Sequence, residues 1–364
     1  MIEPAGKLFC GFFILIIIFA VKLYLMNPKY PIDQIPIFFI VGRGRSGSTL
    51  LRTLFDAHPD VCIPLESRFV QYLYYRYNSV TNWNIELVEQ LLEEIAKGFE
   101  PLDIDKENVF SFVESYQGNL DFGIVCKILY LSIHSEYKKS EILYIGDKNP
   151  RYSFFIPQLL EIFSDARFIH LVRDYRDHLV SVKRSFKKIK DSAYTPFIIA
   201  RWIYYNKQLE KQKKKFPDKF YTLRFEDLIA TPESSLKDLC KFLDLGYNPK
   251  MLEYSSGLKG YYKDDNFNDL HKSLQHPFNI SKIGESSKQL TKVQLFFAEA
   301  LAGKFGAKYG YSEKTSKYKL LKYVVKLLCL PIMFYGSLRY RLKVFIYPSF
   351  NAMKLIHIFL LKIR

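Results

Sequence analysis

The sequence predicts an α/β fold, a parallel β-sheet flanked by helices. Between residues 37 and about 311, short apolar runs alternate with longer stretches in which apolar residues recur at helical spacing. Each apolar run is followed within a few residues by a polar turn, which is typical of strand–helix units. The four predicted strands are residues 37–41, 144–146, 168–172 and 220–223.

The helices are predicted from the residues that follow these strands. Residues 50–55, 87–95 and 198–209 carry apolar side chains at helical spacing. Thr231 and Pro232 precede another apolar stripe and are typical of an N-cap and of the first helical position. The sequence therefore predicts helices at these four places.

Composition excludes several classes of protein. The chain is 49% hydrophobic and 16% aromatic, which is more apolar material than disordered or collagen-like chains contain. Its five Cys are scattered, so we expect neither a zinc site nor a disulfide framework. Of the net charge of +16, residues 312–364 contribute +10, from eight Lys, three Arg and one Glu. Because this basic segment is also apolar, we expect no nucleic-acid partner.

The amino-terminal end is predicted to anchor the chain in a membrane. Residues 8–26 are apolar except for Lys22, a run of about 19 that just suffices to span a bilayer. No small-residue cleavage site follows, so residues 1–30 are interpreted as a single-pass anchor rather than a removed signal peptide. More basic residues follow the run than precede it, which favours the cytosolic face over the Golgi lumen for the rest of the chain.

The carboxyl-terminal segment, residues 312–364, interleaves Lys and Arg with Leu, Val, Ile, Phe and Tyr. This composition is typical of amphipathic helices that lie in an anionic membrane interface, so membrane lipids are a predicted partner. We expect Pro331 and Pro348 to break the segment into shorter helices, none of which is a second span.

The strongest chemical signal is a glycine-rich turn after the first predicted strand, GRGRSGST at residues 42–49. Backbone N–H groups of such a turn and of the helix that follows form a cradle for an anion. The spacing of Gly42 and Gly47 resembles a Walker A loop, but Ser48 stands where that motif needs Lys. ATP is therefore disfavoured, and Arg45 inside the loop suits a phosphate that carries a small anionic group.

Two blocks of sequence carry a resemblance to sulfotransferases that use 3′-phosphoadenosine 5′-phosphosulfate. RSGSTLLR at residues 45–52, followed by DAHPDV at 56–61, resembles the 5′-phosphosulfate loop of the tyrosylprotein sulfotransferase-like branch (family 3). FIHLVRDYRD at residues 168–177, with Ser181 eight residues after Arg173, is similar to the family's 3′-phosphate motif. A planar Arg fork and a Ser hydroxyl would distinguish this nucleotide from ordinary adenosine phosphates.

The resemblance covers residues 36–311 and implies a P-loop-like sulfotransferase domain over that range, with 3′-phosphoadenosine 5′-phosphosulfate as donor and no metal. NISKIG at 279–284 looks like the family segment that closes over the nucleotide, and YTLRFEDL at 221–228 resembles a mainly structural element. The donor-binding residues that the resemblance implies are Arg45, Ser46, Gly47, Ser48, Thr49, Arg173, Ser181, Ser281 and Lys282.

The resemblance also implies three catalytic residues. Glu66, 21 residues after Arg45, matches the position of the branch's catalytic base. Lys148, in GDKNP, matches a family Lys that faces the transferring sulfonate, and it would share the stabilisation of charge with Arg45. His58 and His134 are weaker candidates for the base.

The acceptor and two alternative functions stay open. Where the branch reads Gly-Glu-Glu, residues 64–66 read Pro-Leu-Glu, so the acidic neighbour that binds peptide in that branch is lost. The sulfated hydroxyl is therefore left open among a glycan, a lipid and a protein tyrosine. A nucleotide-dependent kinase is disfavoured by Ser48. A non-catalytic membrane scaffold is disfavoured by the joint presence of Arg45, Lys148 and Glu66, and the sequence leaves a homodimer open.

Overall fold

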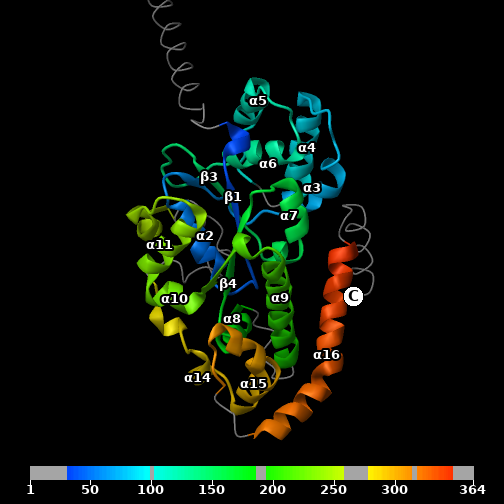
Figure 1. The fold of residues 1–364 in the computed structure, drawn as a ribbon, viewed down its shortest axis with the longest axis vertical. Helices are drawn as coiled ribbons and strands as arrows, with labels where there is room; N and C mark the ends of the chain where they lie inside the picture. Colours follow the sequence, from blue (N-terminus) through cyan, green and yellow to red (C-terminus); the bar gives the residue numbers. More distant parts are fainter. Residues whose placement is uncertain (1–30, 99–101, 186–193, 258–277, 314–317, 347–364) are drawn as a thin grey trace, which may run out of the picture.

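The computed structural model describes residues 31–98, 102–185, 194–257, 278–313 and 318–346. Its centre is a five-stranded parallel sheet in the order β2-β3-β1-β4-β5, with helices on both faces (Figure 1). The strands are β1 (Ile37–Gly42), β2 (Val61–Cys62), β3 (Tyr144–Lys148), β4 (Arg167–Val172) and β5 (Phe220–Arg224). The predicted α/β class and all four predicted strands are confirmed, and the two-residue edge strand β2 was not foreseen.

The helices lie between and after the strands, and their bounds include the four places predicted for helices. The α-helices are α2 (Ser48–Asp56), α3 (Phe69–Tyr77), α4 (Ile85–Gly98), α5 (Lys106–Ser115), α6 (Phe122–Leu131), α7 (Ile156–Ile162), α8 (Tyr175–Ser185), α9 (Thr195–Lys215), α10 (Phe225–Ala230), α11 (Pro232–Leu243), α14 (Ser286–Gln289), α15 (Lys292–Gly306) and α16 (Lys319–Ile346). Short 3-10 helices are η1 (Ile32–Gln34), η2 (Pro150–Phe154), η4 (Pro217–Lys219), η5 (Pro249–Gly257), η7 (Ile280–Lys282) and η8 (Ala307–Tyr309).

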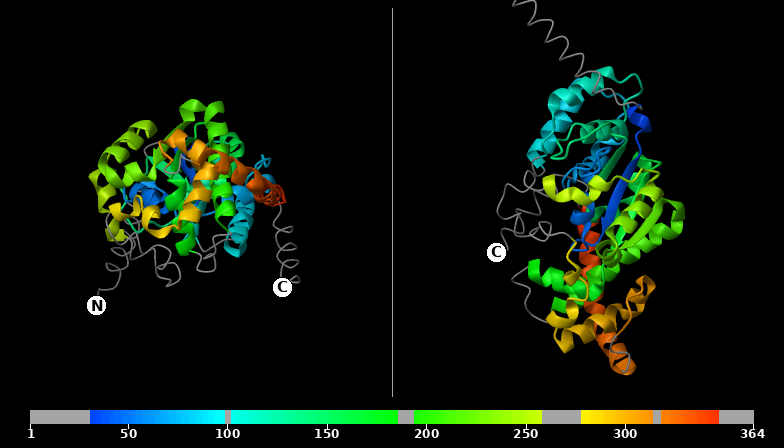
Figure 2. Two further views of the ribbon diagram at one scale, coloured as in Figure 1. Left: turned by 90° about the horizontal axis from the view of Figure 1, so that it is seen from below. Right: turned by 90° about the vertical axis from the view of Figure 1, so that its left-hand side faces the viewer.

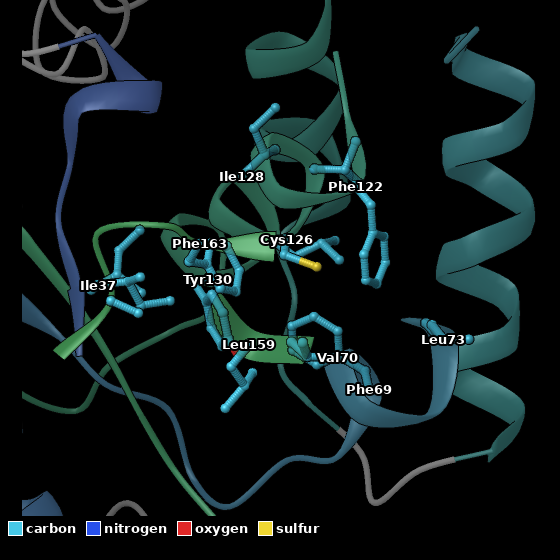
Figure 3. Packing of buried hydrophobic residues seen from close by; sticks show 14 of the residues in the cluster. Ile37, Phe69, Val70, Leu73, Phe122, Cys126, Ile128, Tyr130, Leu159 and Phe163 are labelled. Carbon is cyan, nitrogen blue, oxygen red and sulfur yellow. The ribbon is translucent and has the colours of Figure 1, made fainter. Parts of the chain in front are cut away.

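Alternate residues of β1 point into two hydrophobic layers. Phe39 packs with residues of α3, α6 and α7 on one face of the sheet, a layer that Figure 3 shows from close by. Phe38 and Ile40 pack against α2, α10 and α11 on the other face. Because the whole strand is buried, it reads as a continuous apolar run. The rotated ribbon views of Figure 2 show helices packed around the sheet.

The parallel register brings the ends of three neighbouring strands to one edge. Phe39 pairs with Asp147 of β3 and with Phe168 of β4, so β1, β3 and β4 end at similar heights. The glycine-rich turn, Lys148 and Arg173 follow or close these three strands. In parallel sheets this carboxyl edge is where ligands bind.

The carboxyl-terminal segment differs from its predicted form. Pro331 does not break it, because α16 runs from Lys319 to Ile346 with Pro331 inside. The ring lies on the exposed side of the helix, while Cys329 on the other side is buried in a cluster with residues of α8, α9 and α15. This packing sustains the helix across the proline.

The predicted anchor, residues 1–30, lies outside the described residues. In the described ranges no helix combines the length and the apolar character that a membrane crossing needs.

Candidate active site

The turn after β1 has a backbone that only glycine suits at two points. Gly42 has φ 151° and Gly47 has φ 95°, both on the side of the map that side chains avoid. A Cβ at Gly42 would overlap the Leu171 carbonyl, and one at Gly47 would overlap the Phe225 ring. Arg45 also has a positive φ, 75°, although it has a side chain. The turn is therefore tightly fixed between β4 and α10 before α2 begins at Ser48.

Three arginines lie close together at this edge. Burial, with Arg173 and Arg184 nearby, lowers the pKa of the Arg45 guanidinium. Burial also lowers the pKa of Arg173, although the nearby carboxylates Asp177, Glu226 and Glu285 partly oppose it. Like charges held this close repel one another, so an anion between them would be strongly favoured.

Buried donor atoms at the same place lack acceptors. Within the described part of the chain, Arg45 Nε, Ser46 Oγ and Arg173 Nε are buried and have no hydrogen-bond partner. Such atoms are costly to leave unsatisfied. A ligand that carries phosphate or sulfate oxygens supplies the missing acceptors, so these residues fit the donor that the sequence predicts.

Arg173 is positioned from two sides. Its Nη2 donates to the Lys282 carbonyl at 3.0 Å, and its guanidinium carbon lies 4.4 Å from the centre of the Phe225 ring. Phe225 also fills the space beside Gly47, so one ring supports both the glycine-rich turn and Arg173. Ser181 is buried on α8, which begins two residues after Arg173.

The segment around η7 is tied to α8 through Asp177. Its carboxylate accepts hydrogen bonds from the Gly284 N–H at 2.7 Å and the Ser286 N–H at 2.8 Å. Lys282 thereby presents its carbonyl to Arg173, while its Nζ lies 3.5 Å from Glu285. The exposed Ser281 donates its hydroxyl to Asn279 at 2.5 Å, within its own turn. Of the two predicted donor residues here, Lys282 is brought to the arginines and Ser281 engages its own turn.

Glu66 and Lys148 form an ion pair, with Glu66 Oε2 2.5 Å from Lys148 Nζ. The Lys148 side chain is 5% exposed and that of Glu66 is 36% exposed, so the carboxylate is the half reachable from solvent. Burial raises the pKa of Glu66, but Lys148 and, more weakly, Arg68 and Arg151 outweigh it and lower this pKa below its ordinary value. The structure therefore brings together an ionised carboxylate and a buried cation.

The buried carboxylate of Asp147, the residue before Lys148, fixes the backbone of Lys148. Asp147 accepts hydrogen bonds from Tyr130 Oη at 2.6 Å and Tyr152 Oη at 2.7 Å, and from the backbone N–H of Lys148 at 2.6 Å. Burial raises the pKa of Asp147 to about 6 despite these donors. The Asn149 amide donates to the Ser67 carbonyl at 2.7 Å, which joins the end of β3 to the segment that carries Glu66.

Three residues of the site were missed by the sequence analysis: Phe225, Arg184 and His178. His178 is fully buried with its Nε2 3.1 Å from the Gly44 carbonyl. Burial, with Arg43 nearby, lowers the pKa of His178 well below 6.5, so the ring is neutral and its Nε2–H donates to that carbonyl. His178 and Arg184 lie three residues before and after Ser181 on α8, a helical spacing that places all three on one face.

The weaker base candidates lie elsewhere. Both ring nitrogens of His58 are engaged, Nε2 with the Gly246 carbonyl at 2.7 Å and Nδ1 with the Asp60 N–H at 3.1 Å. His134 is exposed, and its backbone N–H bonds to Asp103. Among the described residues, no group of three or more His, Cys, Asp or Glu could hold a metal ion.

The glycine-rich turn, Lys148 and Arg173 thus lie at the carboxyl edge of a parallel sheet, which is where α/β proteins of this class bind their ligands. The model of the family described as "Sulfotransferase family" matches residues 36–249, more than half of the chain. The chain belongs to this family. The match includes Arg45, Glu66, Lys148, Arg173 and Ser181 and ends before Ser281 and Lys282.

Two curated relatives resemble the chain over similar lengths. Omega-hydroxy-beta-dihydromenaquinone-9 sulfotransferase Stf3 of Mycobacterium tuberculosis (strain CDC 1551 / Oshkosh) is 28% identical over 266 residues, 60% of this chain and 66% of that protein. Protein-tyrosine sulfotransferase 1 of Danio rerio is 27% identical over 225 residues, 61% of this chain and 56% of that protein. The chain therefore spans less than two thirds of the length of both relatives.

Among solved structures, the sulfotransferase domain from the curacin biosynthetic pathway aligns with a TM-score of 0.48 and 20% identity. The alignment covers 78% of this chain and 99% of that one.

Proposed function

We propose that the protein transfers the sulfonate group of 3′-phosphoadenosine 5′-phosphosulfate to a hydroxyl group of an acceptor. The observation that carries this proposal is a pair of arginines, half-buried Arg45 and buried Arg173, whose buried Nε atoms have no acceptor in the described part of the chain. The Glu66–Lys148 ion pair lies at the end of the neighbouring strand β3 and supplies a carboxylate and a cation for the transfer.

The donor would be held by two groups of residues. The N–H groups of the turn and of the first residues of α2, with Arg45, Ser46, Gly47, Ser48 and Thr49, suit the 5′-phosphosulfate. Arg173 and Ser181, with the Lys282 carbonyl orienting Arg173, suit the 3′-phosphate. A triphosphate fits less well because Ser48 replaces the Lys of a Walker A loop.

The proposed reaction is an in-line attack of the acceptor oxygen on sulfur. The bond from that oxygen to sulfur forms, the bond from sulfur to the 5′-phosphate oxygen breaks, and the hydroxyl proton passes to Glu66. Arg45 and Lys148 neutralise the charge that develops on the sulfonate and the leaving phosphate. Because Lys148 lowers the pKa of Glu66, the carboxylate is a weak base, and the proton moves late, when the attacking oxygen has become acidic.

The ion pair couples these two steps. While Glu66 is ionised, Lys148 Nζ is held 2.5 Å from it. Once Glu66 accepts a proton, its attraction for the ammonium falls, and Lys148 is released toward the negative charge that appears at the same moment. Proton transfer and charge stabilisation are therefore linked through one contact.

The acceptor is proposed only as a hydroxyl of a glycan, a lipid or a protein tyrosine. The names of the two relatives describe a menaquinone derivative and protein tyrosine as their substrates. The Pro-Leu-Glu sequence at residues 64–66 leaves the acceptor of this chain open among these classes.

Donor binding and transfer are tested by two measurements on the full chain. Calorimetric titration with 3′,5′-ADP, 5′-AMP and ATP should give the tightest binding for 3′,5′-ADP. Incubation with ³⁵S-labelled donor and separate glycan, lipid and protein fractions should label one fraction. Tightest binding of ATP would favour a kinase, and tight binding of 3′,5′-ADP without labelling of any fraction would favour a non-catalytic scaffold.

We also propose a single-pass membrane location, with residues 8–26 as the anchor and the domain on the cytosolic face. The apolar run and the basic residues after it support this orientation. In sealed inside-out vesicles, added protease should digest the domain. A protected domain would place it in the lumen instead.

A further inference from the structure

The outer face of α16 is the largest concentration of exposed apolar side chains in the described part of the chain. Leu320 is 80% exposed, Leu328 70% and Phe334 69%. Val324, Leu327 and Leu338 belong to the same face, because these positions recur at spacings of three and four residues. Apolar patches of this kind mark contact surfaces rather than ordinary protein surface.

The opposite face of α16 is already used. The helix packs along α9 and α15, and Figure 1 shows it running beside α9 at the edge of the molecule. Lys322 Nζ lies 2.5 Å from Glu313 Oε2 and 3.8 Å from the buried carboxylate of Glu299. Cys329, seven residues or about two helical turns after Lys322, is also buried. The helix is thus fixed with its apolar face outward.

The net positive charge of α16 indicates which kind of partner its exposed apolar face binds. Its sequence contains Lys319, Lys322, Lys326, Arg339, Arg341 and Lys343 and no Asp or Glu. A second copy docked through the same face would bring two cationic helices together, which like-charge repulsion opposes. A bilayer with anionic headgroups matches both the apolar face and the charge, and each basic residue near such a surface strengthens binding by about fivefold.

We propose that α16 docks the domain on an anionic membrane surface, with its outer face immersed among the lipid headgroups and upper acyl chains. Lys319 and Lys326 are exposed beside the inner face, and their long side chains reach headgroups from there. This contact orients the domain independently of the amino-terminal segment, and it does not depend on the proposed reaction.

The test places a tryptophan on the helix and on a matched control position. Leu327 on α16 and Val293 on α15 are both 56% exposed. The full-length Leu327→Trp and Val293→Trp chains are bound to vesicles of phosphatidylglycerol and phosphatidylcholine whose acyl chains carry bromine, a contact quencher. The parent chain, with Trp83 and Trp202, supplies the background emission.

We expect the added emission of Leu327→Trp to be quenched roughly twofold or more beyond that of Val293→Trp. Vesicles of phosphatidylcholine alone should reduce this difference, and so should Lys319→Gln combined with Lys326→Gln. Equal quenching at the two positions would overturn the proposal. A dimer found by sedimentation without vesicles, and converted to monomer by Leu327→Glu but not by Val293→Glu, would assign the face to a second copy and also overturn it.

Discussion

Replacing Arg173 separates the 3′-phosphate contact from every other part of donor binding. In Arg173→Met the side chain keeps its length and its packing over Phe225 but loses its charge and its donors. One charge-assisted hydrogen bond contributes about 1.5–3 kcal/mol, so the dissociation constant for 3′,5′-ADP should rise by about 10- to 150-fold. Arg173→Lys keeps the charge without the planar fork, so its dissociation constant for 3′,5′-ADP should lie between those of the parent and of Arg173→Met.

The matched ligand is 5′-AMP, which lacks the 3′-phosphate. Its affinity, measured by the same calorimetric titration, should change by less than about threefold in Arg173→Met, because the 5′ end is proposed to bind at the glycine-rich turn, away from Arg173. A similar loss for both nucleotides would refute the assignment of Arg173 to the 3′-phosphate. Unchanged affinity for 3′,5′-ADP would refute it as well.

Stability distinguishes a lost contact from a damaged fold. Burial lowers the pKa of Arg173, which means that the ligand-free fold holds this cation at a cost. Removing the charge relieves that cost, while losing the 3.0 Å bond to the Lys282 carbonyl opposes the gain. We expect the free energy of unfolding of Arg173→Met, from urea denaturation, to stay within about 1 kcal/mol of the parent. A larger loss of unfolding free energy would mean that the weaker binding results from a damaged fold rather than from the lost contact.

Three further changes test the rest of the site. Glu66→Gln should lower kcat by about 10²–10⁴-fold in steady-state assays and leave the affinity for 3′,5′-ADP nearly unchanged, because the change removes the base and the ionic partner of Lys148 but none of the residues proposed to bind the nucleotide; near-normal turnover would assign the role of base to another residue. His178→Leu should weaken 3′,5′-ADP by about tenfold in titrations, and His178→Gln, which can still donate to the Gly44 carbonyl, should weaken it less. Because burial raises the pKa of Asp147 from 3.8 to about 6, its carboxyl stabilises the fold most below about pH 4 and this contribution is lost as the pH rises through 6. From pH 4 to pH 7, the unfolding free energy of the parent should therefore fall relative to that of Asp147→Asn by about 2 kcal/mol, and a constant difference would refute the shift.

The sheet was predictable because its central strands are buried on both faces. β1 is a continuous apolar run, and in β4 only His170 interrupts the apolar residues after Arg167, a pattern typical of strands buried on both faces. β2 has two residues, Val61 and Cys62, too few to show any period. The sequence could not predict that α16 continues through Pro331, because this depends on the packing of Cys329 against other helices.

The positions of the proposed donor-binding residues were predictable from the sequence, but the side chains that support them were not. Arg45 lies three residues after β1, Lys148 ends β3 and Arg173 follows β4, so the order of elements already places them at one edge. His178 acts through the carbonyl of Gly44, 134 residues earlier, a contact that exists only in the folded chain. For Lys282 the sequence predicts the segment but not the atom, since its carbonyl rather than its ammonium meets Arg173.

Phe225 explains how the two proposed anion-binding groups, from distant parts of the chain, keep a fixed separation. Its ring lies against Gly47, where any Cβ would collide with it, and beneath the Arg173 guanidinium at 4.4 Å. Its neighbour Glu226 accepts a hydrogen bond from the Asp174 N–H at 2.9 Å, directly after Arg173. The segment after β5, which resembles a mainly structural element, therefore sets the distance between the residues proposed to bind the 5′ and 3′ ends of the donor. Because that distance is set before the donor arrives, little ordering remains to be done on binding.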